Sequence, residues 1–545
     1  MENIMLWQLY KSACRHLLSE QDRDPYSARL GCFDRRYWGW KLVDYPEATY
    51  QRNVYPLAWW LKSDRSLSLE EKGTLADAVT AGLNYATRIQ HEDGSFDQAF
   101  PNEHSFGATA FLLHPMLEAY QVVKEQCPAD DRETIEAGLR KSADFMRLHE
   151  ETHGFISNHL AGAALSLYAA MDFFHEPRYG ERADGLLAHI LDHQSPEGWF
   201  IEYDGADPGY QTLCLYYLAQ IYTKRSGPRL REGLERAIEF LAWFVHPDGT
   251  FGGEYGSRRT AIYYPGGIAV LGQEFPMAAS MDRFLLKSIL NSQTVTLNDV
   301  DMGNMAPLLS NYALTLQAGA DRKGKIPKLP WQEGYINKDF PGAGLYIRST
   351  PRYYAIVGAS NGGVLKIFDR NKGCILWNDG GYVGQLERGN PISTQVTELN
   401  RTCRASAEEI RIETAFQEMS LSAPTPFQFI VLRLMNITVM RNLFLGNLVK
   451  RMLVRMLIRA GKRSPILLTR SIRFERKSIV IRDVLRAARK VSLKWLEFGR
   501  PFVSIHMASA HYFENYTQAP SLSNARRVSV EGLNKSGSLE IETTI

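Results

Sequence analysis

Three polar side chains occupy related positions in this sequence and could together bind an anion and transfer a proton. Asn158 and His159 open a helix-like segment rich in small residues, and Tyr210, 51 residues after His159, opens the next long one. An amide and an imidazole can donate hydrogen bonds to an anion, and a phenol can give or take a proton. The sequence contains no glycine loop followed by lysine and no nucleophile elbow, so it does not indicate phosphoryl transfer or serine hydrolysis.

A repeated loop precedes these residues and predicts how they are positioned. Four helix-like segments each run into an acidic loop that holds a glycine and ends on an aromatic residue. The glycines, at positions 94, 154, 198 and 249, lie 60, 44 and 51 residues apart. That spacing fits a helical hairpin with its connections, and it predicts a toroid of stacked hairpins.

The toroid would gather the polar residues that follow each loop at one mouth of the ring. Those residues are Asp97, Asn158, His159, Glu202, Asp204, Glu254 and Arg258. A simpler interpretation is that each glycine only terminates a helix and each aromatic residue only packs. It leaves the repeated polar residues without an explanation.

The composition is that of a globular protein with more than one domain. The 545 residues are 45% hydrophobic and 23% charged, and six cysteines are scattered without a close pair. Scattered cysteines are typical of reduced thiols, so we expect neither disulfides nor a metal site, and we expect no cofactor. The first residues lack an apolar signal core, which favours a cytoplasmic protein, with a peripheral position on the inner membrane as an option.

The apolar pattern divides the chain into two parts. Helical spacing predominates in the first, and short β-rich runs between Gly, Pro, Asn and Asp predominate in the second. We therefore predict a multidomain α+β protein, an N-terminal α/α toroid followed by an antiparallel β-sandwich. The expected boundaries are 1–320 for the toroid, 321–330 for a linker and 331–545 for the sandwich.

The segment 427–463 interrupts the second part and is strongly basic. It holds eight Lys or Arg and no Asp or Glu, so the net charge of +3 leaves −5 for the rest of the chain. A helix would align Arg451, Arg455 and Arg459 in one stripe, and such a basic amphipathic helix suits an anionic membrane surface. Covering the sandwich and forming a subunit contact are the alternatives. Nucleic acid is not expected, because the cations alternate with aliphatic rather than stacking aromatic residues.

The predicted architecture, the Asn158-His159 pair and the later Tyr210 together resemble the heparinase II/III and oligoalginate lyase superfamily. The resemblance covers about residues 70–385, including Phe340-Pro-Gly-Ala-Gly-Leu-Tyr346 and the run from Gly373 to Gly381. Members cleave uronic-acid polysaccharides by β-elimination. The resemblance therefore implies a lyase that binds an acidic oligo- or polysaccharide, in bacterial polysaccharide metabolism or biosynthesis.

The same resemblance implies roles for individual residues. Asn158 and His159 would neutralise the uronate carboxylate, and Tyr210 would act as the acid, or as both acid and base. Tyrosine needs a neighbouring cation to lower its high pKa. Arg258 and Arg259 are the candidates for that task and for binding the anionic sugar. Tyr263 and Tyr264 are secondary candidates for proton transfer or stacking. The further candidates for binding the substrate are Glu202, Asp204, Glu254 and His104.

One stretch departs from the family pattern. The superfamily's β domain usually contributes a His-x-His type segment, whereas Asn361–Asp369 here contains no histidine. This leaves the catalytic base open and keeps other functions in view. They are a uronyl C5-epimerase, a toroid glycoside hydrolase using Glu202 or Asp204 with Glu254, and a non-catalytic glycan-binding assembly factor at the membrane.

Overall fold

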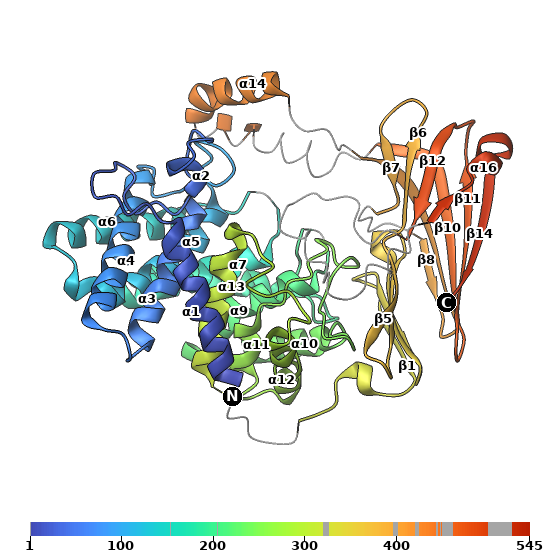
Figure 1. Cartoon of the computed structure of the whole chain (residues 1–545), viewed down its shortest axis with the longest axis horizontal. Coiled ribbons are helices and arrows are strands. Elements are labelled where there is room, and N and C mark those ends of the chain that lie inside the picture. The colour runs from blue at the N-terminus through green and yellow to red at the C-terminus, as the bar shows by residue number, and fades with distance from the viewer. Residues whose placement is uncertain are drawn as a thin grey trace.

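The computed structural model shows a helical toroid beside two antiparallel β-sheets (Figure 1). It describes residues 2–152, 154–203, 205–319, 326–395, 402–419, 425–442, 445–446, 448–449, 462–499 and 526–545. The predicted fold class, a toroid followed by an antiparallel β domain, is confirmed.

The helices of the first part run from the N-terminus to Ala318. They are α1 (Glu2–Glu20), α2 (Arg35–Trp38), α3 (Val54–Ser63), α4 (Leu69–Ile89), α5 (Phe106–Val123), α6 (Ala129–Leu148), α7 (Ser157–Phe174), α8 (Pro177–Asp192), α9 (Pro208–Lys224), α10 (Pro228–Ala242), α11 (Pro265–Leu271), α12 (Pro276–Leu290) and α13 (Met302–Ala318).

Alternate helices of this part form a closed inner ring. The helices α3, α5, α7, α9, α11 and α13 contact one another in that order, and α13 returns to contact α3. Inner helices such as α7 and α9 bury almost their whole length, because their sequences are apolar or small on all sides. Outer helices such as α8 and α10 bury only one stripe. The N-terminal ends of the inner helices therefore share one mouth of the ring.

The repeated loops have a common backbone. Gly94, Gly154, Gly198 and Gly249 all have positive φ, between 88° and 133°, which glycine adopts at no steric cost. In three of the loops the glycine N–H donates to the carbonyl three residues earlier, as Gly94 does to His91. These turns bring each outer helix back to the ring and leave the polar residues at the mouth.

The second part consists of two antiparallel sheets. The first has the order β1-β2-β3-β4-β5, and the second has the order β13-β12-β6-β7-β9-β10-β11-β14 with β8 paired to β9. The strands are β1 (Ile336–Phe340), β2 (Leu345–Ser349), β3 (Tyr353–Gly358), β4 (Val364–Asp369), β5 (Cys374–Asp379), β6 (Tyr382–Leu386), β7 (Pro391–Ser393), β8 (Thr402–Ala405), β9 (Glu409–Glu418), β10 (Arg463–Phe474), β11 (Ile479–Ala487), β12 (Leu493–Phe498), β13 (Arg526–Val528) and β14 (Ser538–Thr544).

The first sheet is buried on both faces because it lies between the toroid and the second sheet (Figure 1). Ile347 and Ile356 belong to the hydrophobic core of the toroid. Their neighbours Tyr346 and Val357 point the other way, into the core of the sandwich. Alternation along a strand thus attaches the β part firmly to the ring.

The basic segment begins with a helix, α14 (Pro426–Ile437), followed by a short 3₁₀ turn, Val439–Arg441. Thr425 caps α14, its hydroxyl accepting the N–H of Gln428. The predicted stripe Arg451, Arg455 and Arg459 lies outside the described residues. Among the residues described, no helix combines the length and apolar character needed to cross a membrane.

Candidate active site at the toroid mouth

Asn158 and Glu202 are joined by a pair of hydrogen bonds between neighbouring hairpins. The Asn158 backbone N–H donates to Glu202 Oε1 over 3.0 Å, and its Nδ2 donates to Oε2 over 2.7 Å. A β-bridge between Ile156 and Glu202 brings the two segments together. Both side chains are buried, and Asn158 Oδ1 has no hydrogen-bond partner within the described chain. The amide is therefore held in one orientation with an acceptor left over.

Burial changes the protonation of Glu202. Desolvation raises the pKa of its carboxyl to about 8, although the bonds from Asn158 act in the opposite direction. Asp207 raises this pKa further and Arg258 lowers it, so both charges lie close enough to act on it. At neutral pH the carboxyl is mainly protonated, which limits negative charge around Asn158.

Asp207 fixes the start of α9 and the turn of the following hairpin at once. Its Oδ1 accepts the Tyr210 N–H over 2.9 Å, and its Oδ2 accepts the N–H of Arg258 over 2.8 Å and that of Thr260 over 3.3 Å. A Cβ on Gly256 would lie 2.6 Å from Asp207 Oδ2, so only glycine allows this approach. One buried carboxylate thus places Tyr210 and Arg258 relative to each other.

Arg258 is buried with part of its guanidinium unsatisfied. Its Cζ lies 4.0 Å from the centre of the Tyr203 ring, while Nε and Nη2 have no hydrogen-bond partner among the residues described. Burying unsatisfied guanidinium donors is costly unless an anion can bind them. Tyr203 reaches this position with a left-handed backbone, φ 54°.

The tyrosines of the site form one electrostatic neighbourhood. Burial raises the pKa of Tyr203 well above its ordinary value, Arg258 lowers it, and Tyr210, Glu202 and Glu151 raise it. Tyr210 itself is half-buried at the start of α9. Tyr210, Arg258 and Glu202 thus all act on the pKa of the same phenol, that of Tyr203.

Arg259, Tyr263 and Tyr264 are buried side chains between the Arg258 turn and the start of α11. Arg259 has a left-handed backbone, φ 59°, and burial, together with Arg258, lowers its pKa to about 10. Tyr263 packs on Phe251. Tyr264 precedes α11, and its pKa is raised by burial and then by Tyr210. Tyr264 thus lies near the site, whereas Tyr263 faces the loop aromatic.

His159 is oriented by a carboxylate. Its Nδ1 lies 2.7 Å from Glu151 Oε2, and its ring meets the edge of Phe111 at 5.0 Å. Gly107 makes room for the ring, since a Cβ there would lie 2.7 Å from His159 Nδ1. A proton on Nδ1, held by the carboxylate, leaves Nε2 as the basic nitrogen.

Glu254 faces the β domain. Its Oε2 forms an ion pair with Lys366 over 2.8 Å, and its Oε1 accepts from Asn378 over 3.1 Å. Asn361 donates to the carbonyls of Glu254 and Gly256 over 2.8 and 2.7 Å. Asn361 and Lys366 belong to the stretch that lacks the family's histidine, so that stretch supports the arginine turn instead.

His104 lies in the first repeated loop, within a local network. Its Nδ1 is 2.8 Å from both Asp93 Oδ2 and Ser95 Oγ, and its ring stacks on His91 with the ring centres 4.0 Å apart. These contacts give His104 a structural task in its own loop. Asp204, the remaining candidate, lies outside the described residues.

Several residues that build the site were not predicted from the sequence. They are Tyr203, Asp207, Glu151, Asn361 and Lys366. Asp207 carried a usable signal, because Asp before Pro-Gly is typical of a helix N-cap. Glu151 precedes its partner His159 by only 8 residues, but no motif marks that contact. The contacts of Tyr203, Asn361 and Lys366 join segments far apart in the chain.

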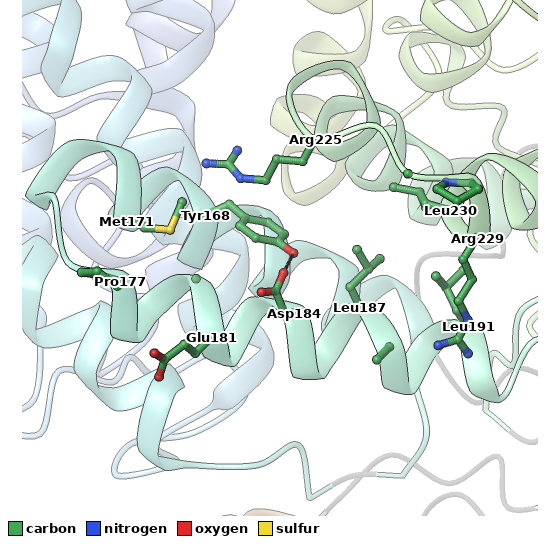
Figure 2. A pocket seen from close by; sticks show the side chains of 14 residues that line it. Tyr168, Met171, Pro177, Glu181, Asp184, Leu187, Leu191, Arg225, Arg229 and Leu230 are labelled. Atoms are coloured by element: carbon green, nitrogen blue, oxygen red, sulfur yellow. Dashed lines mark hydrogen bonds between the residues drawn. The ribbon is translucent and has the colours of Figure 1, made fainter.

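A surface pocket of about 590 Å³ lies elsewhere on the toroid, between the α7–α8 and α9–α10 hairpins (Figure 2). Tyr168 and Met171 line it from the C-terminal half of α7, the end opposite Asn158. In Figure 2 the Tyr168 hydroxyl donates to Asp184, and Arg225 is paired with Asp172. Its described charged groups are thus largely paired. The pocket is therefore a weaker candidate for the active site than the mouth.

Comparisons with known proteins show similarity in sequence to one domain and in fold to several structures. Residues 50–296 match the sequence model of the ulvan lyase N-terminal domain. The fold is similar to chondroitin AC lyase of Streptomyces coelicolor, with a TM-score of 0.57 and 12% identity over 91% of this chain and 67% of that one. Heparan sulfate lyase HepC of Pedobacter heparinus, in a mutant form, gives 0.44 and 11% over 90% and 70%. No curated protein sequence matches the chain.

The matched region runs from the start of α3 through the turn carrying Arg258, so it contains Asn158, Glu202 and Tyr210. The similarity to the Streptomyces enzyme extends through both the toroid and the sheets. Residues 50–296 are therefore similar to a polysaccharide lyase domain, and the chain shares the fold of an α/α toroid followed by antiparallel sheets.

Proposed function

We propose that this protein cleaves a uronate-containing, acidic polysaccharide by β-elimination at the toroid mouth. The observation that carries the proposal is the buried Arg258, whose unsatisfied guanidinium nitrogens lie in one electrostatic neighbourhood with Tyr210 and the Asn158–Glu202 pair. A substrate carboxylate would supply the missing acceptors. The names of the matched domain and the similar enzyme, ulvan lyase and chondroitin AC lyase, support an acidic polysaccharide as the substrate class.

The reaction breaks the C5–H bond and the C4–O bond of the uronate and forms a C4=C5 double bond. Neutralising the carboxylate makes the C5 proton removable near neutral pH. In this proposal Arg258 and the second amide hydrogen of Asn158 take that task, and the mainly neutral Glu202 avoids repelling the substrate. The neutralising role expected of His159 passes in this proposal to Arg258.

Proton transfer is assigned to the two remaining groups. His159, oriented by Glu151 through Nδ1, takes the C5 proton on Nε2 in this proposal. Tyr210 gives its phenolic proton to the leaving glycosidic oxygen. After product release, the proton on His159 passes back to the phenolate through solvent, which restores both groups.

The geometry favours elimination over hydrolysis by two carboxylates. Both oxygens of Glu202 accept from Asn158, and Glu254 is held by Lys366 and Asn378 at the β domain. Neither is placed as a free acid beside a free base.

Ultraviolet absorbance of the new C4=C5 double bond, followed on a panel of uronate polymers, tests the proposal. Growth of the absorbance together with chain cleavage is the expected result. New reducing ends without absorbance would instead indicate a hydrolase, and deuterium uptake at C5 without cleavage would indicate an epimerase. Binding without any of these signals would support a glycan-binding protein.

We also propose that the protein acts at an anionic membrane surface. The segment 427–463 is its support, since it holds eight basic residues and no acidic one. Such a segment gains favourable energy near anionic lipid headgroups.

A further inference from the structure

Helix α14 is attached to the toroid by its polar side. Arg433 Nε lies 2.8 Å from Asp44 Oδ2, and the guanidinium lies 5.2 Å from the centre of the Tyr45 ring. Asn102 Nδ2 donates to the Asn436 carbonyl over 2.9 Å, and the Asn436 side chain is buried. Figure 1 shows α14 lying across the toroid next to α2. The contacts hold the helix by polar groups, which is the reverse of ordinary amphipathic packing.

The apolar side of α14 faces solvent. Phe427, Ile430, Leu434 and Ile437 recur every three or four residues and are between 54% and 72% exposed, so they form one stripe on the helix. Leu445 and Leu448 are exposed farther along the same segment. Contiguous apolar residues left exposed in this way mark a surface that binds something else.

The exposed stripe lies at the same end of the toroid as the candidate active site. Asp44 precedes α3 and Asn102 precedes α5, just as the Asn158 and Tyr210 segments begin α7 and α9. All four positions are at the N-terminal ends of inner helices, which form one mouth of the ring. The loop that carries Asp44 also exposes Trp40 and Leu42, and tryptophan is enriched where proteins meet the membrane–water interface.

Charge identifies the occupant of this surface. No acidic residue occurs between positions 427 and 463, whereas eight basic residues do. A second copy of this chain would have to bring one basic segment against another. An anionic bilayer offers both an apolar interior for the stripe and negative headgroups for the basic residues of the segment.

We propose that the apolar face of α14 inserts into the surface of an anionic lipid bilayer and turns the toroid mouth toward acidic glycans anchored in that membrane. Docking itself does not depend on the chemistry proposed above, whereas the anchored substrate class rests on it. The helix lies in the interface and does not span the bilayer.

Sedimentation with vesicles tests the docking directly. The intact protein is expected to bind vesicles of phosphatidylcholine and phosphatidylglycerol and to bind pure phosphatidylcholine vesicles weakly. Replacing Ile430 and Leu434 together by Glu is expected to weaken binding at least ~10-fold, because two inserted apolar side chains are lost. Leu148→Glu is the matched control, since Leu148 is also well exposed but lies at the end of α6.

Two outcomes would overturn the docking proposal. One is equal binding of the Ile430→Glu/Leu434→Glu variant and the intact protein to the anionic vesicles. The other is a dimer in vesicle-free solution, measured by analytical ultracentrifugation, that the variant dissociates, because the stripe would then be a contact between copies.

A pair of substrates separates this proposal from the proposed chemistry. A uronate oligosaccharide is offered free in solution and attached to a lipid in the anionic vesicles. The double variant is expected to cleave the free form normally and the anchored form at least ~10-fold more slowly. If both forms are cleaved equally by the variant, the orienting role is wrong. If the intact protein cleaves neither form yet still binds vesicles, the proposed chemistry fails while docking stands.

Discussion

Two buried arginines, one in the β-sandwich and one at the toroid mouth, occupy similar positions against a tyrosine ring but differ in their partners. Arg470 lies 5.7 Å from the Tyr382 ring, pairs with Asp379 over 2.9 Å and with Asp483 over 2.8 Å, and donates to the Gly363 carbonyl. Burial acts to lower the pKa of Arg470, but the two aspartates outweigh it and hold that pKa well above its ordinary value.

Arg258, by contrast, forms no ion pair among the described residues and keeps two guanidinium nitrogens without partners. The difference is the one expected between an arginine that stabilises the fold and one that, as proposed above, binds a ligand. A charge that is buried together with its counter-charges is already satisfied and needs no further anion. A buried charge without counter-charges carries an uncompensated desolvation cost, which a bound anion can offset.

The largest expected effect concerns Arg470. Replacing it by Met leaves Asp379 and Asp483 buried without a cation, so we expect a loss of ~3–5 kcal/mol in the free energy of unfolding. Urea unfolding measures it. Arg258→Met is the matched variant and should cost less than ~1 kcal/mol, because Arg258 has no buried ion pair to break. Equal losses in the two variants would remove the distinction between the arginines.

Activity should show the opposite order. Arg258→Gln is expected to lower kcat/KM by ~100- to 1,000-fold, the scale of a lost charge-stabilising donor. The same variant should discriminate poorly between a uronate substrate and its carboxyl-reduced analogue in binding. Retained preference for the charged substrate would show that the carboxylate binds elsewhere.

The tyrosines near the two arginines offer a second contrast. Tyr210→Phe should lose at least about 100-fold in turnover, as expected for a lost general acid or base, with little change in stability. Tyr382→Phe should leave turnover unchanged and cost ~1 kcal/mol of stability, because Tyr382 donates to Asp483 over 2.7 Å. Near-normal turnover of Tyr210→Phe would exclude Tyr210 from the chemistry.

Glu202 links the site to pH. Its folded pKa of about 8 lies above the ordinary value of 4.5, so the folded state holds the proton more tightly than the unfolded state. Stability should therefore fall as pH rises from 4.5 toward about 8, by up to ~1.4 kcal/mol per pH unit from this group. Glu202→Gln should remove that slope, as measured by urea unfolding at several pH values. An unchanged slope would mean that Glu202 ionises normally.

The smallest effect belongs to the surface pocket of Figure 2. Arg225→Gln removes an exposed ion pair with Asp172, which is worth ~0–1 kcal/mol. We expect kcat/KM to be unchanged within twofold on the scale of ordinary surface substitutions. A large loss of activity would move attention from the mouth to this pocket.

The sequence predicted the parts of the site that have local signatures. The glycine loops repeat, so the toroid and the shared position of Asn158, Glu202 and Arg258 could be inferred from spacing alone. The helix-opening position of Tyr210 followed from the same pattern. That these residues act on substrate stays a prediction.

The remaining parts depend on tertiary contacts that no short motif reports. The bonds from Asn361 to the Glu254 and Gly256 carbonyls join positions more than 100 residues apart. His104 was predicted to bind substrate, but Asp93 and Ser95 hold its ring within its own loop. The Arg451 stripe lies outside the described residues. The exposed apolar face of α14 follows from the contacts of its polar side with the toroid, which the sequence does not report.

The Asp207 carboxylate, which accepts N–H groups from both α9 and the following turn, has a consequence for how such an enzyme can change. Asp207 positions the backbone of both Tyr210 and Arg258. A change that moves one of these two residues would therefore also move the other when the substrate specificity changes. New specificities would then arise at the periphery, in residues such as Arg259 or Tyr264, while the reacting core is inherited as a unit.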